Sequence, residues 1–190
     1  MTVPPRLGSC TLPPLNAELD GLWDVILDLA EDLTAQGWLL VGGQMVMLHG
    51  LAAGRVATRA SHDIDLLADL LTSRGAVGEC VRAVRRLGFE PVEANERWLL
   101  HRFVRPGDQA VVDVLAPDHA PPAWKPTTIP PRMTLKIDGG RQALERAVLI
   151  EVTKGERTVD EVFADRGHDA WRVLGDQAED AFARWRLLLG

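Results

Sequence analysis

The stretch that decides the fold is RASHDIDLLADL, residues 59–70. It places Asp63 and Asp65 one residue apart at the head of an apolar run. In a β-strand the side chains at i and i+2 point to the same face, so the spacing predicts two carboxylates that project together, with Cα atoms roughly 7 Å apart. A buried carboxylate is costly unless something compensates its charge. The pair therefore indicates either a cation site or a solvated strand end, and the neighbouring segments decide between them.

Upstream of these acids the sequence reads as strand, glycine turn and helix. WLLV, residues 38–41, is a short apolar strand that ends on Gly42 and Gly43, and QMVMLHGLAA, residues 44–53, reads as a buried helix. Glycines let the backbone approach a ligand closely, and a helix N-terminus offers free N–H groups and a positive dipole end. This turn is therefore predicted to bind the phosphates of a nucleotide.

Just before the acids, Arg59 and Ser61 supply a guanidinium and a hydroxyl. Both groups hold phosphate oxygens well, because they donate hydrogen bonds and the guanidinium is charged. We therefore predict that they extend the nucleotide-binding site. The alternative for each is a surface loop charge and a local strand cap.

Downstream, Asp113 stands alone between valines in AVVDVL, residues 110–115. If this strand lies beside residues 62–69, its carboxylate joins Asp63 and Asp65. Carboxylate oxygens suit hard divalent cations, and a pair of Mg²⁺ ions about 4 Å apart uses a third carboxylate. We predict that these acids are catalytic and hold two Mg²⁺ ions, and that Asp113 also accepts the proton of an attacking hydroxyl. The alternative for Asp113 is an edge strand with the acid in water.

The bulk numbers bound the class of protein. The chain has 190 residues, of which 46% are hydrophobic and 25% charged, as in an ordinary soluble domain. A net charge of −6 argues against a large basic face for nucleic acid. Cys10 and Cys80 have no CxxC partner, which excludes a zinc knuckle and suits a reducing cytoplasm. No apolar run approaches about 18 residues, so no membrane contact is expected.

The order of elements predicts an α/β (α+β) fold with a mixed sheet flanked by helices. Proline-rich residues 1–14 are expected to form a flexible N-terminal segment without regular structure. The main domain is expected to span residues 15–159, and the weakly periodic residues 160–190 to form a C-terminal helical appendage. Within the main domain we expect helices over 16–36, 44–53, 75–87 and 140–147, and strands at 38–41, 62–69, 148–152, FEPV, RWLLHRFV and AVVDVL.

At these motifs the chain resembles the nucleotidyltransferase superfamily, and more narrowly the AbiEii/MenT-type toxin nucleotidyltransferases of bacterial toxin–antitoxin systems. The likeness covers about residues 37–153 and rests on GGQMVMLHG, RASHDIDL, LGFE with HRF, VVDVLAPD and GGRQALERAVLIEV. It implies a polymerase-β-like nucleotidyltransferase fold, Mg²⁺, an NTP substrate and a tRNA 3′ end as acceptor. It also implies an antitoxin protein as partner.

The chain departs from that family in one respect. Such toxins usually carry a further helical half with a lysine that completes the nucleotide site, whereas the last lysine here is Lys154. Either Lys136 or an arginine substitutes, or the activity is weak or lost. Two alternatives therefore stay open: a nucleotidyltransferase for aminoglycoside-type antibiotics, whose cationic substrate suits an acidic protein, and a catalytically degenerate nucleotide- or protein-binding module.

Overall fold

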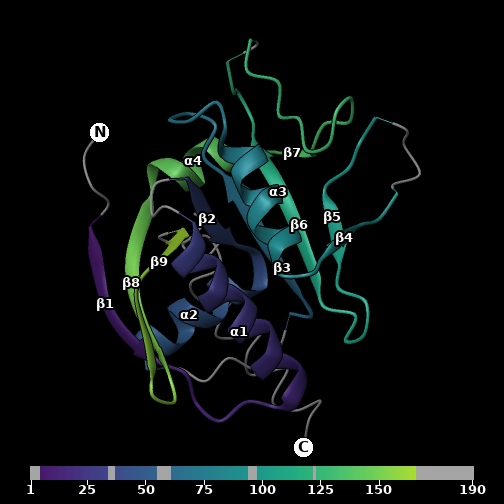
Figure 1. The fold of residues 1–190 in the computed structure, drawn as a ribbon. Coiled ribbons are helices and arrows are strands. Elements are labelled where there is room, and N and C mark those ends of the chain that lie inside the picture. Colours follow the sequence, from purple (N-terminus) through teal and green to yellow (C-terminus); the bar gives the residue numbers. More distant parts are fainter. Residues whose placement is uncertain (1–4, 34–36, 55–60, 94–97, 122, 166–190) are drawn as a thin grey trace, which may run out of the picture.

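The fold is a mixed β-sheet with helices on both faces (Figure 1). The computed structural model describes residues 5–33, 37–54, 61–93, 98–121 and 123–165, and in the last of these ranges the side chains up to residue 159. The helices in these ranges are α1 (Ala17–Asp32), α2 (Gly42–Ala52), α3 (Ala76–Arg86) and α4 (Gly140–Glu145). None of them is long and apolar enough to cross a membrane.

The described residues form nine strands in the order β1-β8-β9-β2-β3-β6-β5-β4, with β7 beside β6. Their bounds are β1 (Arg6–Thr11), β2 (Trp38–Val41), β3 (Asp63–Ala68), β4 (Glu90–Pro91), β5 (Arg102–Val104), β6 (Val111–Pro117), β7 (Lys136–Ile137), β8 (Ala147–Lys154) and β9 (Arg157–Asp165). Strand β3 runs parallel to β6 and antiparallel to β2. The predicted α/β class with a mixed sheet is therefore confirmed.

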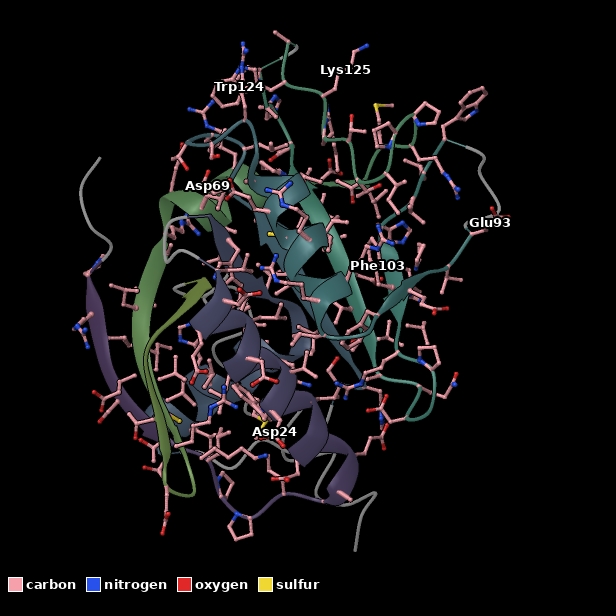
Figure 2. The ribbon with its side chains drawn as sticks, in the orientation of Figure 1. Asp24, Asp69, Glu93, Phe103, Trp124 and Lys125 are labelled. Atoms are coloured by element: carbon pink, nitrogen blue, oxygen red, sulfur yellow. The ribbon has the colours of Figure 1, made fainter. Side chains whose placement is uncertain are left out.

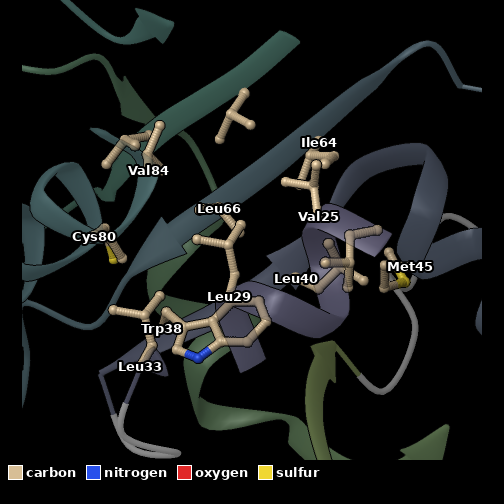
Figure 3. Close-up of a cluster of buried hydrophobic side chains, with 14 of the residues drawn as sticks. Val25, Leu29, Leu33, Trp38, Leu40, Met45, Ile64, Leu66, Cys80 and Val84 are labelled. Carbon is tan, nitrogen blue, oxygen red and sulfur yellow. The ribbon is translucent and has the colours of Figure 1, made fainter. Parts of the chain in front are cut away.

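Alternation along the central strands divides the core into two layers, because successive side chains point to opposite faces. On one face, side chains of β2, β3 and β6 pack under α1, α2 and α3, and Figure 3 shows part of this layer. The labelled members of that layer are Val25, Leu29, Leu33, Trp38, Leu40, Met45, Ile64, Leu66, Cys80 and Val84. The opposite face holds a smaller cluster made of Leu39, Val41, Leu67, Leu115, Ala143 and Leu149.

The N-terminal segment differs from the expectation. Residues 6–11 form β1, which pairs in parallel with β8, so the prediction of no regular structure over residues 1–14 is wrong there. The prolines that suggested a loop flank the strand rather than interrupt it: Pro5 precedes it and Pro13 follows it. Proline removes a backbone donor and is therefore tolerated at strand ends. Burial of Cys10 ties β1 to the core.

The C-terminal part also needs a correction. Residues 160–165 belong to β9 and not to a helical appendage, and residues 166–190 lie outside the described ranges. Lys154 and Arg157 face each other across a two-residue turn in which Gly155 has φ +61°. Such a turn matches the twist of a hairpin. It returns the chain alongside β8, so β9 lies between β8 and β2.

The segment after β6 lies at one end of the molecule. Figure 2 shows Trp124 and Lys125 at that end, with Asp69 on the same side and Asp24 of α1 toward the opposite end. The guanidinium of Arg74 lies over the Trp124 ring, 5.4 Å from its centroid. Since Asp69 directly follows β3, the acids that begin β3 lie at the other end of that strand.

Candidate metal centre

The structure brings the three predicted acids together. In the parallel pairing of β3 with β6, Asp65 lies opposite Asp113, and Asp63 lies two residues earlier on β3. All three alternate with residues of the larger core layer, so they share the sheet face of Leu67 and Leu115. One ligand oxygen from each carboxylate lies within 4.8 Å of the other two. Oxygen donors at this separation fit a hard divalent cation such as Mg²⁺.

Negative charge in this centre is only partly compensated. The Asp113 side chain is 8% exposed. Burial raises the pKa of Asp65 to about 6, and the charges of Asp63 and Asp113 add to that rise, while Arg102 opposes it. A raised carboxyl pKa means that the ionised form is disfavoured where it stands. A bound cation would relieve that cost, and the cluster is one that could hold a metal ion.

Arg102 is the residue that sequence reasoning missed. It lies opposite Asp113 in the antiparallel pairing of β5 with β6. Its Nε donates to Asp113 Oδ1 at 3.0 Å and its Nη2 donates to Oδ2 at 2.7 Å, while 48% of its side chain stays exposed. The signal was present in the hairpin: the turn RPGD, residues 105–108, fixes the register that sets Arg102 against Asp113.

Gly42 forms the wall of the centre beside Asp65. It begins α2 directly after Val41, which lies opposite Asp65 in the antiparallel pairing of β2 with β3. A Cβ atom at Gly42 would stand 1.9 Å from Asp65 Oδ2, and the residue has φ +68°. The start of α2 has no side-chain capping hydrogen bond. No side chain therefore caps the first N–H groups of this helix, and phosphate binding by them stays a prediction.

The next residues of α2 contact Ser61, which lies just before the strand that carries Asp63 and Asp65. A Cβ atom at Gly43 would stand 2.3 Å from Ser61 Cβ, and Gln44 Nε2 donates to the Ser61 carbonyl oxygen at 2.9 Å. Ser61 Oγ in turn donates to Asp63 Oδ1 at 2.5 Å. Ser61 therefore orients an acid in this structure, and its contact with a phosphate stays a prediction. Arg59 lies outside the described residues.

Lys136, one predicted substitute for the missing lysine, and Lys154, the last lysine of the chain, both lie away from the acids. Lys154 Nζ contacts Asp20 Oδ1 at 3.1 Å and Asp24 Oδ1 at 2.6 Å, so α1 holds it. Lys136 pairs with Ala116, which alternates with Leu115 on β6 and belongs to the opposite sheet face from Asp113. Among the described residues, Arg102 is the basic side chain that touches the acid cluster.

Comparisons of the chain with protein-family models, with curated proteins and with solved structures gave no match. The functional argument therefore depends on the residues of the centre themselves. They are three carboxylates on adjacent strands, a glycine turn that presents a helix N-terminus to one of them, and a guanidinium bound to another.

Proposed function

We propose that the protein is a Mg²⁺-dependent nucleotidyltransferase that transfers NMP from an NTP to an acceptor hydroxyl, with a tRNA 3′ end as the acceptor and a role as the toxin of a toxin–antitoxin pair. The observation that carries the proposal is the convergence of Asp63, Asp65 and Asp113, with ligand atoms within 4.8 Å of one another. The contact of Asp65 with the glycine that begins α2 supports it, because triphosphate and cation then bind side by side.

The order of elements supports a polymerase-β-like arrangement. Strand β2 leads through Gly42 into α2. Strand β3, which pairs with β2, carries Asp63 and Asp65. The neighbouring parallel strand β6 then contributes Asp113. This order is the one that the family resemblance implies for a nucleotidyltransferase.

The proposed reaction forms one bond and breaks one. The acceptor oxygen attacks the α-phosphorus, the new O–P bond forms, and the bond between the α-phosphorus and the bridging oxygen breaks to release pyrophosphate. Bound Mg²⁺ would supply positive charge to the triphosphate and to the leaving pyrophosphate. We propose that the N–H groups at the start of α2 bind phosphate oxygens and that Asp113 accepts the hydroxyl proton.

A second candidate keeps the chemistry and changes the acceptor to an aminoglycoside-type antibiotic. Three arginines between residues 86 and 105 are paired with carboxylates: Arg86 with Asp32, Arg102 with Asp113, and Arg105 with Asp108. Together with the net charge of −6, this favours a cationic acceptor over a polyanion. The placement of Lys136 and Lys154 away from the acids favours the third candidate, a degenerate binding module.

Labelled NTPs separate these candidates. The wild type, Asp65→Asn and a control, Asp108→Asn, are each incubated with one labelled NTP, Mg²⁺ and either total tRNA or an aminoglycoside. Asp108 is a suitable control because its carboxylate belongs to the turn between β5 and β6 and binds Arg105. We expect wild type and Asp108→Asn to label tRNA and Asp65→Asn to label nothing. Label on the aminoglycoside alone moves the assignment to the second candidate, and no transfer by the wild type rejects nucleotidyl transfer.

A further inference from the structure

The ion pair between Arg102 and Asp113 changes what the acid centre can bind before a nucleotide arrives. Both carboxylate oxygens of Asp113 accept hydrogen bonds from the guanidinium. A bidentate pair of this kind is among the stronger charge-assisted contacts in proteins. It also stands between two adjacent, hydrogen-bonded strands, so the backbone holds both residues in place.

The charges of the centre nearly match one divalent cation. The three ionised carboxylates carry three negative charges, and the Arg102 guanidinium carries one positive charge. The remaining two negative charges are balanced by a single Mg²⁺ or Mn²⁺ ion. A second dication in the same place would leave an excess of positive charge next to a fixed guanidinium. Like charges at such short range repel strongly where water is partly excluded.

Arg102 cannot easily leave Asp113 to make room. The Asp113 side chain is 8% exposed, and breaking its pair would leave a buried carboxylate without a partner. The guanidinium also interacts favourably with Asp63 and Asp65, and these carboxylates, led by the hydrogen bonds of Asp113, raise the pKa of Arg102 above its ordinary value. Arg102 is therefore hydrogen-bonded to Asp113, while the charges of Asp63 and Asp65 also attract its guanidinium.

From this geometry we infer that Arg102 is a positioning residue that stands in for one cation, so that the nucleotide-free protein binds a single divalent ion through Asp63 and Asp65. Any second Mg²⁺ then enters together with the triphosphate, whose own negative charge balances it. This inference rests on the proposed function, since it requires the acid cluster to be a cation site.

Counting bound Mn²⁺ tests the inference without any reaction. Mn²⁺ alone is titrated into nucleotide-free protein, and the free ion is measured by electron paramagnetic resonance. We expect one ion per chain in the wild type and two in Arg102→Gln, in which Asp113 becomes available as a ligand. Arg105→Gln is the matched control, because it removes an arginine three residues away that binds Asp108, and it should bind one ion.

Two further readings keep the test decisive if Arg102→Gln does not fold. A wild type that binds two ions per chain without nucleotide overturns the inference and leaves the proposed function standing. Asp113→Asn should still bind one ion, because Asp113 is not a ligand in the nucleotide-free protein, and loss of that ion overturns the inference. A wild type that binds no Mn²⁺ overturns both the inference and the metal-dependent function, while one bound ion without any nucleotidyl transfer rejects only the function.

Discussion

Gly42 and Asp65 touch so closely that no side chain fits between them: a Cβ atom on Gly42 would stand 1.9 Å from Oδ2 of Asp65. The contact joins the start of α2 to the middle of the acid cluster. It arises because Val41, the residue before Gly42, lies opposite Asp65 across β2 and β3. The glycine turn and the acids of β3 are therefore parts of one centre.

Gly42→Ala should therefore damage the centre more than the fold. The positive φ of residue 42 costs about 1 kcal/mol in any L-residue, and the added methyl group must push the Asp65 carboxylate aside. Gly54→Ala is a matched control, since Gly54 has φ +70° and a Cβ atom there would meet nothing within 4 Å. In urea unfolding both variants should lose about 1 kcal/mol. Mn²⁺ affinity should fall about tenfold in Gly42→Ala alone, and equal affinities would contradict the close contact.

Asp65 predicts a specific dependence of stability on pH in metal-free protein. Its pKa is raised from 3.8 to about 6, with burial as the largest cause and the charge of Asp63 the next. Between pH 4 and 6 the folded protein therefore keeps a proton on Asp65 that the unfolded chain has already lost. Stability from this group should therefore fall as pH rises from about 4 to 6 and stay level above. Asp65→Asn should be more stable than wild type by about 2 kcal/mol at pH 7.5, and equal to it near pH 4.

The measurement is urea unfolding in EDTA at each pH. The idea that the Asp65 charge destabilises the fold is wrong in either of two cases. In the first, the free energy of unfolding of Asp65→Asn still declines between pH 4 and 6. In the second, Asp65→Asn is no more stable than the wild type at pH 7.5. Adding Mg²⁺ should stabilise the wild type at pH 7.5 and much less at pH 5, where a proton competes for Asp65.

Ser61→Ala should weaken cation binding through Asp63. The hydroxyl of Ser61 donates to Asp63 Oδ1 at 2.5 Å and holds that carboxylate in orientation. Outer contacts of this kind typically change metal affinity by about tenfold or more. Ser73→Ala is the control, because the Ser73 hydroxyl accepts from the Gly75 amide and lies in another segment. Mn²⁺ titration that gives the same affinity for both variants would remove Ser61 from the site.

Lys154→Met should cost stability and leave the metal centre unchanged. Lys154 is 15% exposed and its Nζ binds Asp20 and Asp24 on α1; Figure 2 labels Asp24 on that helix. Leaving two carboxylates without this partner should cost about 1–2 kcal/mol in urea unfolding. The exposed Lys136→Met should cost less than about 0.5 kcal/mol. A loss of nucleotide binding in either variant would instead show that this lysine takes part in the site.

Local patterns were enough for most elements. The three- and four-residue spacing of apolar residues predicted α1, and Asn16 Oδ1 caps its start by accepting from the Leu19 amide at 2.9 Å. The alternation around Asp63 and Asp65 predicted β3 and the shared direction of the two acids. Signals of this kind lie within a few residues of one another, so the linear chain contains them.

Two strands, β1 and β9, were harder to predict because their stability comes from partners distant in sequence. Strand β1 forms against β8, more than a hundred residues later, and β9 joins β2 at the centre of the sheet. Neither has an apolar pattern strong enough to identify it alone. The glycine at residue 155, which closes the β8–β9 turn with φ +61°, was the readable clue to the second strand.

By itself the sequence determined that two carboxylates share one face of a strand, because a strand repeats every two residues. Only the tertiary structure decided what surrounds them. Pairing of β3 with β6 and of β6 with β5 sets Asp65, Asp113 and Arg102 side by side, and pairing of β2 with β3 brings Gly42 against Asp65. Such registers depend on the burial of whole strand faces, since a one-residue slip would exchange the acids with core residues.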